Sequence, residues 1–300
     1  MGAWGIGLYS SDFAMDLRST VGAVARLPFE PGRLLELLRA SEPTAADDPA
    51  DEDHCVFWLT VADQFARRGI DCPEARDRAL AVIDDGSDLA MMSRLGMAEK
   101  DLAKRRKMLE ELRPKIAAPP APGRPRPVLK APQPLLMHSG DTLAFPVSDG
   151  HCINPYFPSK EAMRPAWRQD GWGVFLVVEC GHVFEYLAWY RPLVAAIAFA
   201  DRPVLSNLAG PRLWYLQRAG TCSQSHFRKM ELAPLGRLPL DPGRLAGLFP
   251  ERPSPRSDAV SDISIANRLL GVKLVLDHRD RRLRARTPQL DDVAAVLTAG

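Results

Sequence analysis

Residues 117–135 read AAPPAPGRPRPVLKAPQPL, and this stretch divides the chain. Seven of these residues are proline. Proline fixes the φ angle, lacks a backbone N–H and biases the residue before it toward extended conformations. The stretch therefore excludes a helix and predicts a semi-rigid spacer, partly in the polyproline conformation. We place a domain boundary here, with a linker over residues 117–135.

Apolar residues recur at helical spacing before the linker. Ser11 is suited to cap a first helix, and Pro31 and Pro73 suit the first turns of two later helices. The pattern predicts five or six helices with short connections, hence an all-α helical bundle over residues 1–116, with a polar acidic loop over residues 42–53. The residues expected on the buried faces are Phe13, Leu17, Val21, Val24, Ala25, Leu34, Leu35, Leu38, Trp58, Val61, Ala62, Phe65, Ala75, Ala79, Val82, Ile83, Leu102, Leu109, Leu112 and Ile116.

After the linker the pattern changes to short apolar or alternating runs, which are typical of strands. The expected strands are residues 142–147, 173–178, 183–189, 212–218 and 227–232. A turn centred on Gly181 is expected to join the second and third of them into a hairpin. Asp241 and Pro242 suit the cap and first turn of a short helix that ends near Phe249.

These runs predict a small antiparallel β-rich domain over residues 136–250. Residues 251–300 are expected to form a partly flexible basic tail with a short helix over 261–270. The fold class is therefore α+β: an N-terminal helical bundle, a proline-rich linker and a β-rich C-terminal domain.

The composition indicates an ordinary globular protein. The 300 residues are 46% hydrophobic and 25% charged with a formal net charge of +2, so no strong field attracts a membrane or nucleic acid. No apolar run approaches the length of about 18 residues that a membrane span needs, and no secretory leader begins the chain. Five cysteines, an odd number, favour a reducing cytoplasm over a disulfide framework. Nucleic-acid binding through the basic tail is the weaker of two alternative functions, because the tail's arginines lack interleaved aromatic residues.

The N-terminus reads MGAWGIG. We expect Trp4 to anchor this segment, with Gly5 and Gly7 supplying backbone angles that other residues resist. The opening resembles a bacterial family of small helical domains of unknown function that begins Met-Gly-x-Trp-Gly and continues with an aromatic residue, Asp, Ala and Asp. The residues that match this continuation are Tyr9, Asp12, Ala14 and Asp16. The resemblance implies a helical fold for the first third of the chain and no particular activity.

A second resemblance lies just after the linker. Residues 139–147 read SGDTLAFPV and are followed by Asp149-Gly150. This string is similar to the first strand of an immunity-protein family found beside bacterial polymorphic toxins. The resemblance implies a β-rich domain that binds a toxin and blocks it without catalysis. The chain departs from that pattern in a long insertion over residues 154–171.

Four cysteine and histidine residues are candidates for a metal or thiol site. Cys180, His182, Cys222 and His226 provide two Cys and two His, the usual number of ligands for structural zinc, but no C-x-x-C pair occurs. Alternatively, Cys222 is a nucleophile with His226 or His182 as its base, in a thiol-dependent hydrolase-type enzyme. We favour small core residues for the cysteines, and expect no metal, no cofactor and no catalytic residue.

The insertion carries the favoured site. Loops hold functional residues more often than the elements they connect, and aromatic side chains are frequent anchors of protein interfaces. The residues expected to bind a partner are Asn154, Tyr156, Phe157 and Trp167. The sequence thus predicts a cytoplasmic bacterial protein whose function is non-catalytic protein binding, in the immunity-like form if the second resemblance holds.

Overall fold

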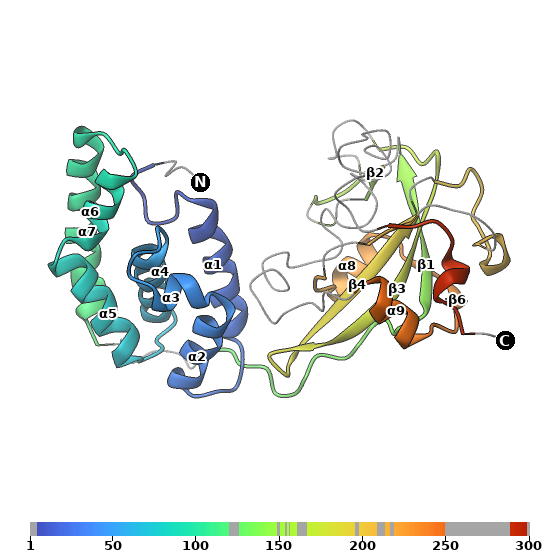
Figure 1. The fold of residues 1–300 in the computed structure, drawn as a ribbon, viewed down its shortest axis with the longest axis horizontal. Helices are drawn as coiled ribbons and strands as arrows, with labels where there is room; N and C mark the ends of the chain where they lie inside the picture. The colour runs from blue at the N-terminus through green and yellow to red at the C-terminus, as the bar shows by residue number, and fades with distance from the viewer. Residues whose placement is uncertain are drawn as a thin grey trace. The chain divides into compact units, whose positions relative to one another are not determined.

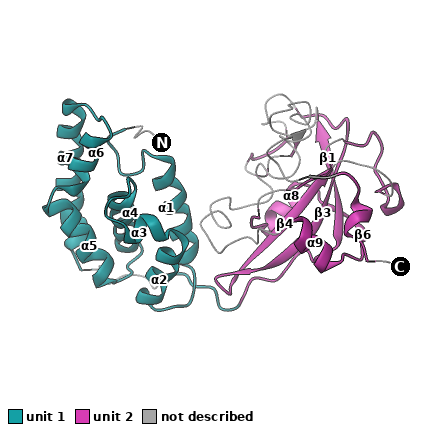
Figure 2. Cartoon of the chain, in the orientation of Figure 1, with its two compact units in different colours: residues 1–131, 255–261 teal, residues 132–254, 262–300 magenta. Residues whose placement is uncertain are grey.

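The computed structural model describes residues 5–119, 126–148, 151–153, 155, 157–160, 167–195, 198–208, 214–216, 219–249 and 289–298. The chain forms two compact units, and the division falls between Ala131 and Pro132, within the proline-rich stretch (Figure 2). The first unit is helical and the second is built on an antiparallel sheet, so the fold is α+β (Figure 1).

Seven helices make up the described part of the first unit. They are α1 (Asp12–Val24), α2 (Pro31–Ser41), α3 (Pro43–Asp47), α4 (His54–Arg67), α5 (Pro73–Asp84), α6 (Ser87–Arg94) and α7 (Glu99–Ala117). Ser11 caps α1 by accepting a hydrogen bond from the Ala14 backbone N–H. The short α3 lies in the stretch expected to be a loop. It forms because Pro43 starts the turn and because the Ala46 carbonyl accepts a hydrogen bond from the buried Trp58 indole.

Helix α4 lies at the centre of this unit. Every residue from Cys55 to Phe65 is buried, as expected for a helix that is apolar on nearly all sides. Two of its buried polar residues are paired: Asp63 accepts from the Tyr9 hydroxyl and the Arg67 guanidinium, and the Gln64 amide oxygen accepts from Arg68. The other helices bury their apolar stripes around α4.

The second unit contains seven described strands, all antiparallel, in the order β2-β1-β3-β4-β5-β7 with β6 also on β1. Their bounds are β1 (Asp141–Ser148), β2 (His151–Cys152), β3 (Gly171–Val183), β4 (Leu187–Ala195), β5 (Trp214–Leu216), β6 (Ala233–Arg237) and β7 (Gln289–Leu290). Strand β1 pairs with β3 along one side, and first with β6 and then with β2 along the other. Pro146 lies where β1 passes from β6 to β2, a position at which its missing N–H breaks no pairing on that side.

The sheet is covered on both faces, which explains why β1 and β3 read as continuous apolar runs. One core cluster includes Leu143, Phe145, Val147, Phe175, Val177, Tyr190, Cys222 and Met230. A second core cluster lies on the opposite face of the sheet. It includes Val174, Leu176, Val178, Leu193, Trp214, Leu216, Phe249, Val293 and Val296. Helix α8 (Gln224–Lys229) and its flanking residues contribute to the first cluster. The end of α9 (Pro242–Leu248) and the 3-10 helices η1 (Leu205–Leu208) and η2 (Val293–Val296) contribute to the second.

The hairpin turn is not at Gly181. Strand β3 continues to Val183, and the turn is Phe184-Glu185-Tyr186, where Phe184 and Glu185 take left-handed φ angles of 51° and 65°. Gly181 instead pairs with Trp189, and a Cβ at Gly181 would lie 3.3 Å from the indole Nε1. Because Gly181 has no side chain, it leaves room for Trp189 on the neighbouring strand. The local sequence does not distinguish a glycine with this packing role from a glycine in a turn.

One further expectation is wrong. Residues 227–232 do not form a strand, because Ser223 accepts from the His226 N–H and caps α8 at that point. The described end of the tail packs on the second unit: β7 pairs with β5, and Val293 and Val296 are buried against the sheet. Helix α9 begins as expected, with Asp241 accepting from two backbone N–H groups of its first turn. The helix expected over 261–270 lies outside the described residues.

The described part of the linker is non-helical, and each end of it is hydrogen-bonded to the unit to which it belongs. Arg126 donates to the Ala25 and Phe29 carbonyls, and the Leu129 N–H donates to the Arg26 carbonyl, all within the first unit. Four residues later, Gln133 bonds to the β3–β4 hairpin of the second unit through its backbone and its amide. Proline removes donors from this stretch, and Arg126, Leu129 and Gln133 supply the hydrogen bonds that hold its described part.

Gly173 tests the packing of the sheet. A Cβ at Gly173 would overlap the ring of Phe145, its cross-strand neighbour, which is fully buried and has no room to move. We expect Gly173→Ala to destabilise the second unit by about 1–3 kcal/mol through overpacking. Hydrogen exchange of β1 and β3 peptides in increasing urea measures this loss.

Gly247→Ala is the matched control, because no atom lies near its Cβ position on α9. It should leave stability unchanged or raise it slightly, since alanine has the higher helix propensity. Equal stability of the Gly173 and Gly247 variants would contradict the tight packing of Phe145 over Gly173.

Candidate functional site

The N-terminal segment is anchored through its carbonyl groups. The Ser10 hydroxyl donates to the Gly5 and Gly7 carbonyls at 2.7 and 2.6 Å. Neither glycine has a φ in the left-handed region, so the expectation that they supply unusual backbone angles is wrong for both. Trp4, the expected anchor, lies outside the described residues.

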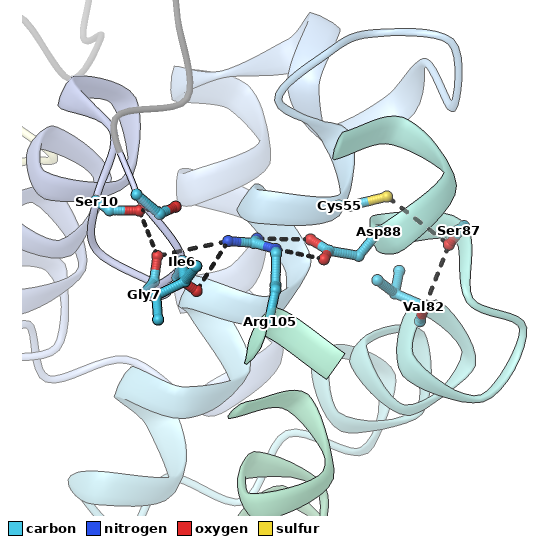
Figure 3. A network of polar contacts seen from close by, with 9 residues as sticks. Ile6, Gly7, Ser10, Cys55, Val82, Ser87, Asp88 and Arg105 are labelled. Carbon is cyan, nitrogen blue, oxygen red and sulfur yellow. Dashed lines mark hydrogen bonds and ion pairs between the residues drawn. The ribbon is translucent and has the colours of Figure 1, made fainter. Parts of the chain in front are cut away.

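Arg105 completes this anchor from α7 (Figure 3). Its guanidinium donates to Asp88 of α6 in a two-pronged ion pair, with N–O distances of 2.6 and 2.7 Å, and reaches the Ile6 and Gly7 carbonyls at 3.4 and 3.5 Å. The two charged side chains are 3% and 0% exposed, so each depends on the other. The network is structural: it joins the N-terminal segment to α6 and α7.

The sequence carries a signal for the burial of Arg105. Arg105 falls within the run 104–107, which reads KRRK and indicates a solvated, ion-paired helix face. However, Arg105 lies three residues after Leu102 and four before Leu109, on the apolar stripe of the same helix. A single cation on a buried stripe predicts a buried partner.

Removing Asp88 tests the importance of this pair. Asp88→Ala leaves the Arg105 charge buried without its partner, and we expect the helical unit to lose about 3–5 kcal/mol of stability. Hydrogen exchange of peptides from α6, α7 and residues 5–10 measures the loss. Asp84→Ala is the control, because Asp84 of α5 pairs with Arg113 of α7 at a site where both side chains are about half exposed (48%). No loss of stability is expected from this control. A similar effect of both substitutions would refute the anchoring role.

The cysteine and histidine candidates do not form one site. His182 is exposed and its Nε2 lies 2.7 Å from the Gln133 carbonyl, whereas His226 belongs to α8. Within the described ranges, which include all four side chains, no group of three His, Cys, Asp or Glu residues is placed to hold a metal ion. Glu179, the acidic residue next to Cys180 in the sequence, lies 3.9 Å from Arg191.

The surroundings of Cys222 are the reverse of those that activate a thiol. Its side chain is buried in the core cluster of β1 and β3, and this burial raises its pKa to about 12. Its Sγ contacts the Ser223 carbonyl at 3.7 Å, which does not stabilise a thiolate. Burial also lowers the pKa of His226. Reactive cysteines need a lowered pKa and access to solvent, so this geometry favours a core residue over a nucleophile.

Thiol labelling distinguishes these roles. At pH 8 only about one Cys222 thiol in ten thousand is ionised if its pKa is near 12, so iodoacetamide should modify Cys222 only after unfolding. Cys180, which is partly exposed, should react first in the native protein. Mass spectrometry of the labelled peptides, with Cys180→Ala as a control, measures the order. Rapid native labelling of Cys222 would restore the thiol-enzyme alternative.

The insertion residues have different surroundings. Asn154 and Tyr156 lie outside the described residues. Phe157 is 39% exposed, which is unusual for a large apolar side chain in this protein. Trp167 is half-buried, and the Lys160 ammonium lies over its ring at 4.8 Å from the centroid.

The insertion is held against the end of α8. Lys160 also forms an ion pair with Glu231 at 2.5 Å, and the Lys229 ammonium donates to the Pro155 carbonyl at 3.1 Å. Glu231 takes a left-handed φ of 55° directly after the helix, which is the usual way for a helix to end. These contacts hold Pro155 before Phe157 and Lys160 after it, and Phe157 itself is exposed. Sequence reasoning selected Phe157 and Trp167 but missed Lys160, Lys229 and Glu231, because their partners are about seventy residues away along the chain.

No protein-family model, no curated protein and no solved structure matches this chain. The two resemblances drawn from the N-terminal motif and from the first strand therefore stay predictions. In the described part of the chain, no helix is both long and apolar enough to cross a bilayer.

Proposed function

We propose that the protein is a non-catalytic, cytoplasmic protein-binding module that contacts its partner through the insertion surface, defined as Phe157, Lys160, Trp167 and Glu231. The observation that supports this most directly is the double role of Lys160, which covers the Trp167 ring and pairs with Glu231. Pro155 and Lys160, the residues held on either side of Phe157, reduce the ordering that binding through Phe157 requires.

Preorganisation is what makes such a surface useful. Ordering a flexible loop and its side chains costs free energy at each association, and a loop already fixed avoids part of that cost. Exposed aromatic side chains supply much of the affinity in protein interfaces when they enter a pocket on the partner. Phe157 meets both conditions, since it is exposed and its neighbours are held by named contacts.

Positively charged residues that lie close to Trp167 and Glu231 along the chain suggest the kind of partner. Arg168 and the last turn of α8, with Arg228 and Lys229, are exposed and positively charged. Complementary charge speeds association and excludes wrong partners more than it adds affinity. The partner surface is therefore proposed to hold an apolar pocket bordered by acidic side chains. If the immunity-like resemblance holds, that surface belongs to a bacterial toxin.

The alternative functions receive less support. A thiol-dependent enzyme conflicts with the burial of Cys222. The basic residues proposed for nucleic-acid contact lie within 273–286, outside the described residues. Neither alternative has an observation of its own in the described part of the chain.

Affinity purification from the native host, with tagged wild type and a Phe157→Ala variant, tests the proposal. We expect a stoichiometric protein partner with wild type and at least about tenfold weaker binding by the variant, a loss of 1.4 kcal/mol or more. Titration calorimetry with the purified partner measures the difference.

Val204→Ala is the matched control, because Val204 is 58% exposed on the same unit but away from the insertion contacts. Lys160→Met, which removes the cation over Trp167, should weaken binding less than Phe157→Ala. A partner that binds the Phe157 variant as tightly as wild type would show that the insertion surface is not the interface.

A further inference from the structure

Tyr9 lies at the centre of a polar cluster in the first unit, where α1 and α4 pack together (Figure 1). The Arg18 guanidinium of α1 lies over the Tyr9 ring, 4.8 Å from the ring centroid. The Tyr9 hydroxyl donates to the Asp63 carboxylate and accepts from the Gln64 amide, both on α4. The cluster therefore joins the N-terminal segment to both helices.

The end of α4 brings two more arginine side chains to this cluster. The Arg67 Nε donates to the Asp63 carboxylate at 2.7 Å. The Arg68 Nη1 donates to the side-chain and backbone oxygens of Gln64 at 2.5 and 3.1 Å. Burial lowers the pKa of Arg68, and the like charges of Arg18 and Arg67 lower it further. Three guanidinium groups thus lie close enough to repel one another.

The cluster is short of negative charge. Its carboxylate is Asp63, whose side chain is 4% exposed and already bonded to Tyr9 and Arg67. Burial and the hydrogen bond to Asp63 raise the pKa of Tyr9, so this phenol stays neutral. Three arginine cations and one carboxylate leave a net charge of +2. An anion that binds between like charges offsets their repulsion.

Capping of α4 explains only part of this arrangement. Cations at the end of a helix complement its last carbonyl groups, and Arg68 does so by donating to the Gln64 carbonyl. Arg18 belongs to α1, is exposed, and donates to no acceptor in the part of the chain that the structure describes. Arg67 is 62% exposed, and a guanidinium has further N–H donors beyond the one that Asp63 accepts. Donors of Arg18 and Arg67 are therefore accessible from solvent.

We propose that Arg18 and Arg67 bind the phosphoryl group of a phosphate monoester, with Arg68 adding positive charge behind them. A phosphate monoester carries a charge of about −2 above pH 7, which matches the net charge of the cluster. The planar donors of a guanidinium suit phosphate oxygens. Tyr9 supports Arg18 and Asp63 holds Arg67, so both groups are positioned before the ligand arrives. The proposal is independent of the insertion surface.

Titration calorimetry on the full-length protein tests the ligand class. We expect saturable binding of phenyl phosphate at about pH 7.5, where it is a dianion, at up to about 10 mM ligand. Phenyl sulfate is the matched probe, because it has nearly the same shape and a single negative charge. It should bind at least about tenfold more weakly than phenyl phosphate.

A peptide with one phosphoserine, compared with its unphosphorylated form, distinguishes two sources of the same group. Tighter binding of the phosphopeptide than of phenyl phosphate would identify a phosphorylated protein side chain as the source. Equal or weaker binding of the phosphopeptide would identify a small phosphorylated molecule.

Substitutions of exposed arginines test the place of binding. Arg18→Gln removes one guanidinium without touching the Asp63 pair, and it should weaken the binding of phenyl phosphate at least about tenfold. Arg18→Lys keeps the charge without the planar donors and should restore part of the affinity. Arg33→Gln is the matched control, because Arg33 of α2 is exposed and paired with Glu36, and it should bind as wild type does.

Three outcomes would overturn the proposal: no saturable binding of phenyl phosphate, equal affinity for phenyl sulfate, or wild-type affinity in Arg18→Gln. Circular dichroism of each variant confirms that a loss of binding is not a loss of fold. The Phe157→Ala variant, which alters the second unit, should bind phenyl phosphate as wild type does.

Discussion

The second unit depends on covering an apolar sheet on both faces. Strands β1 and β3 direct large apolar side chains to each face in alternation, with Phe145 and Phe175 on one and Val174 and Leu176 on the other. Leaving either face in water would cost about 25 cal/mol for each Å² of apolar surface. This requirement brings in α8 and its flanking residues on one side, and α9 with η2 on the other. Because η2 comes from residues 293–296, the end of the chain returns to the sheet.

The candidate surface is a consequence of that covering. Helix α8 covers one face, and its end provides Lys229 and the turn residue Glu231, which hold Pro155 and Lys160 of the insertion. The surface is not an addition to the fold, because it forms where a covering helix ends.

Cys222 shows how covering the sheet disfavours thiol chemistry at a buried residue. Cys222 lies in a Ser-rich segment that looks polar in sequence, yet its side chain is buried beneath the sheet and its pKa is raised to about 12. Arg105 shows the opposite case, since a residue from a charged run is buried with Asp88. Local composition describes the neighbours of a residue along the chain, whereas burial depends on which face of an element it occupies.

The sequence by itself determined the order and type of most elements: the helical first unit, the break at the proline-rich stretch, the apolar strands and the capped start of α9. These follow from local rules, namely periodicity, proline geometry and capping residues, which act within a few positions. Only the tertiary structure decided the long-range arrangements. They include the use of Gly181 for Trp189, the pairing of β7 with β5, the choice of Asp88 as the partner of Arg105 and the meeting of Glu179 with Arg191. Each joins residues whose partners are set by packing of the whole unit, and local patterns do not identify those partners.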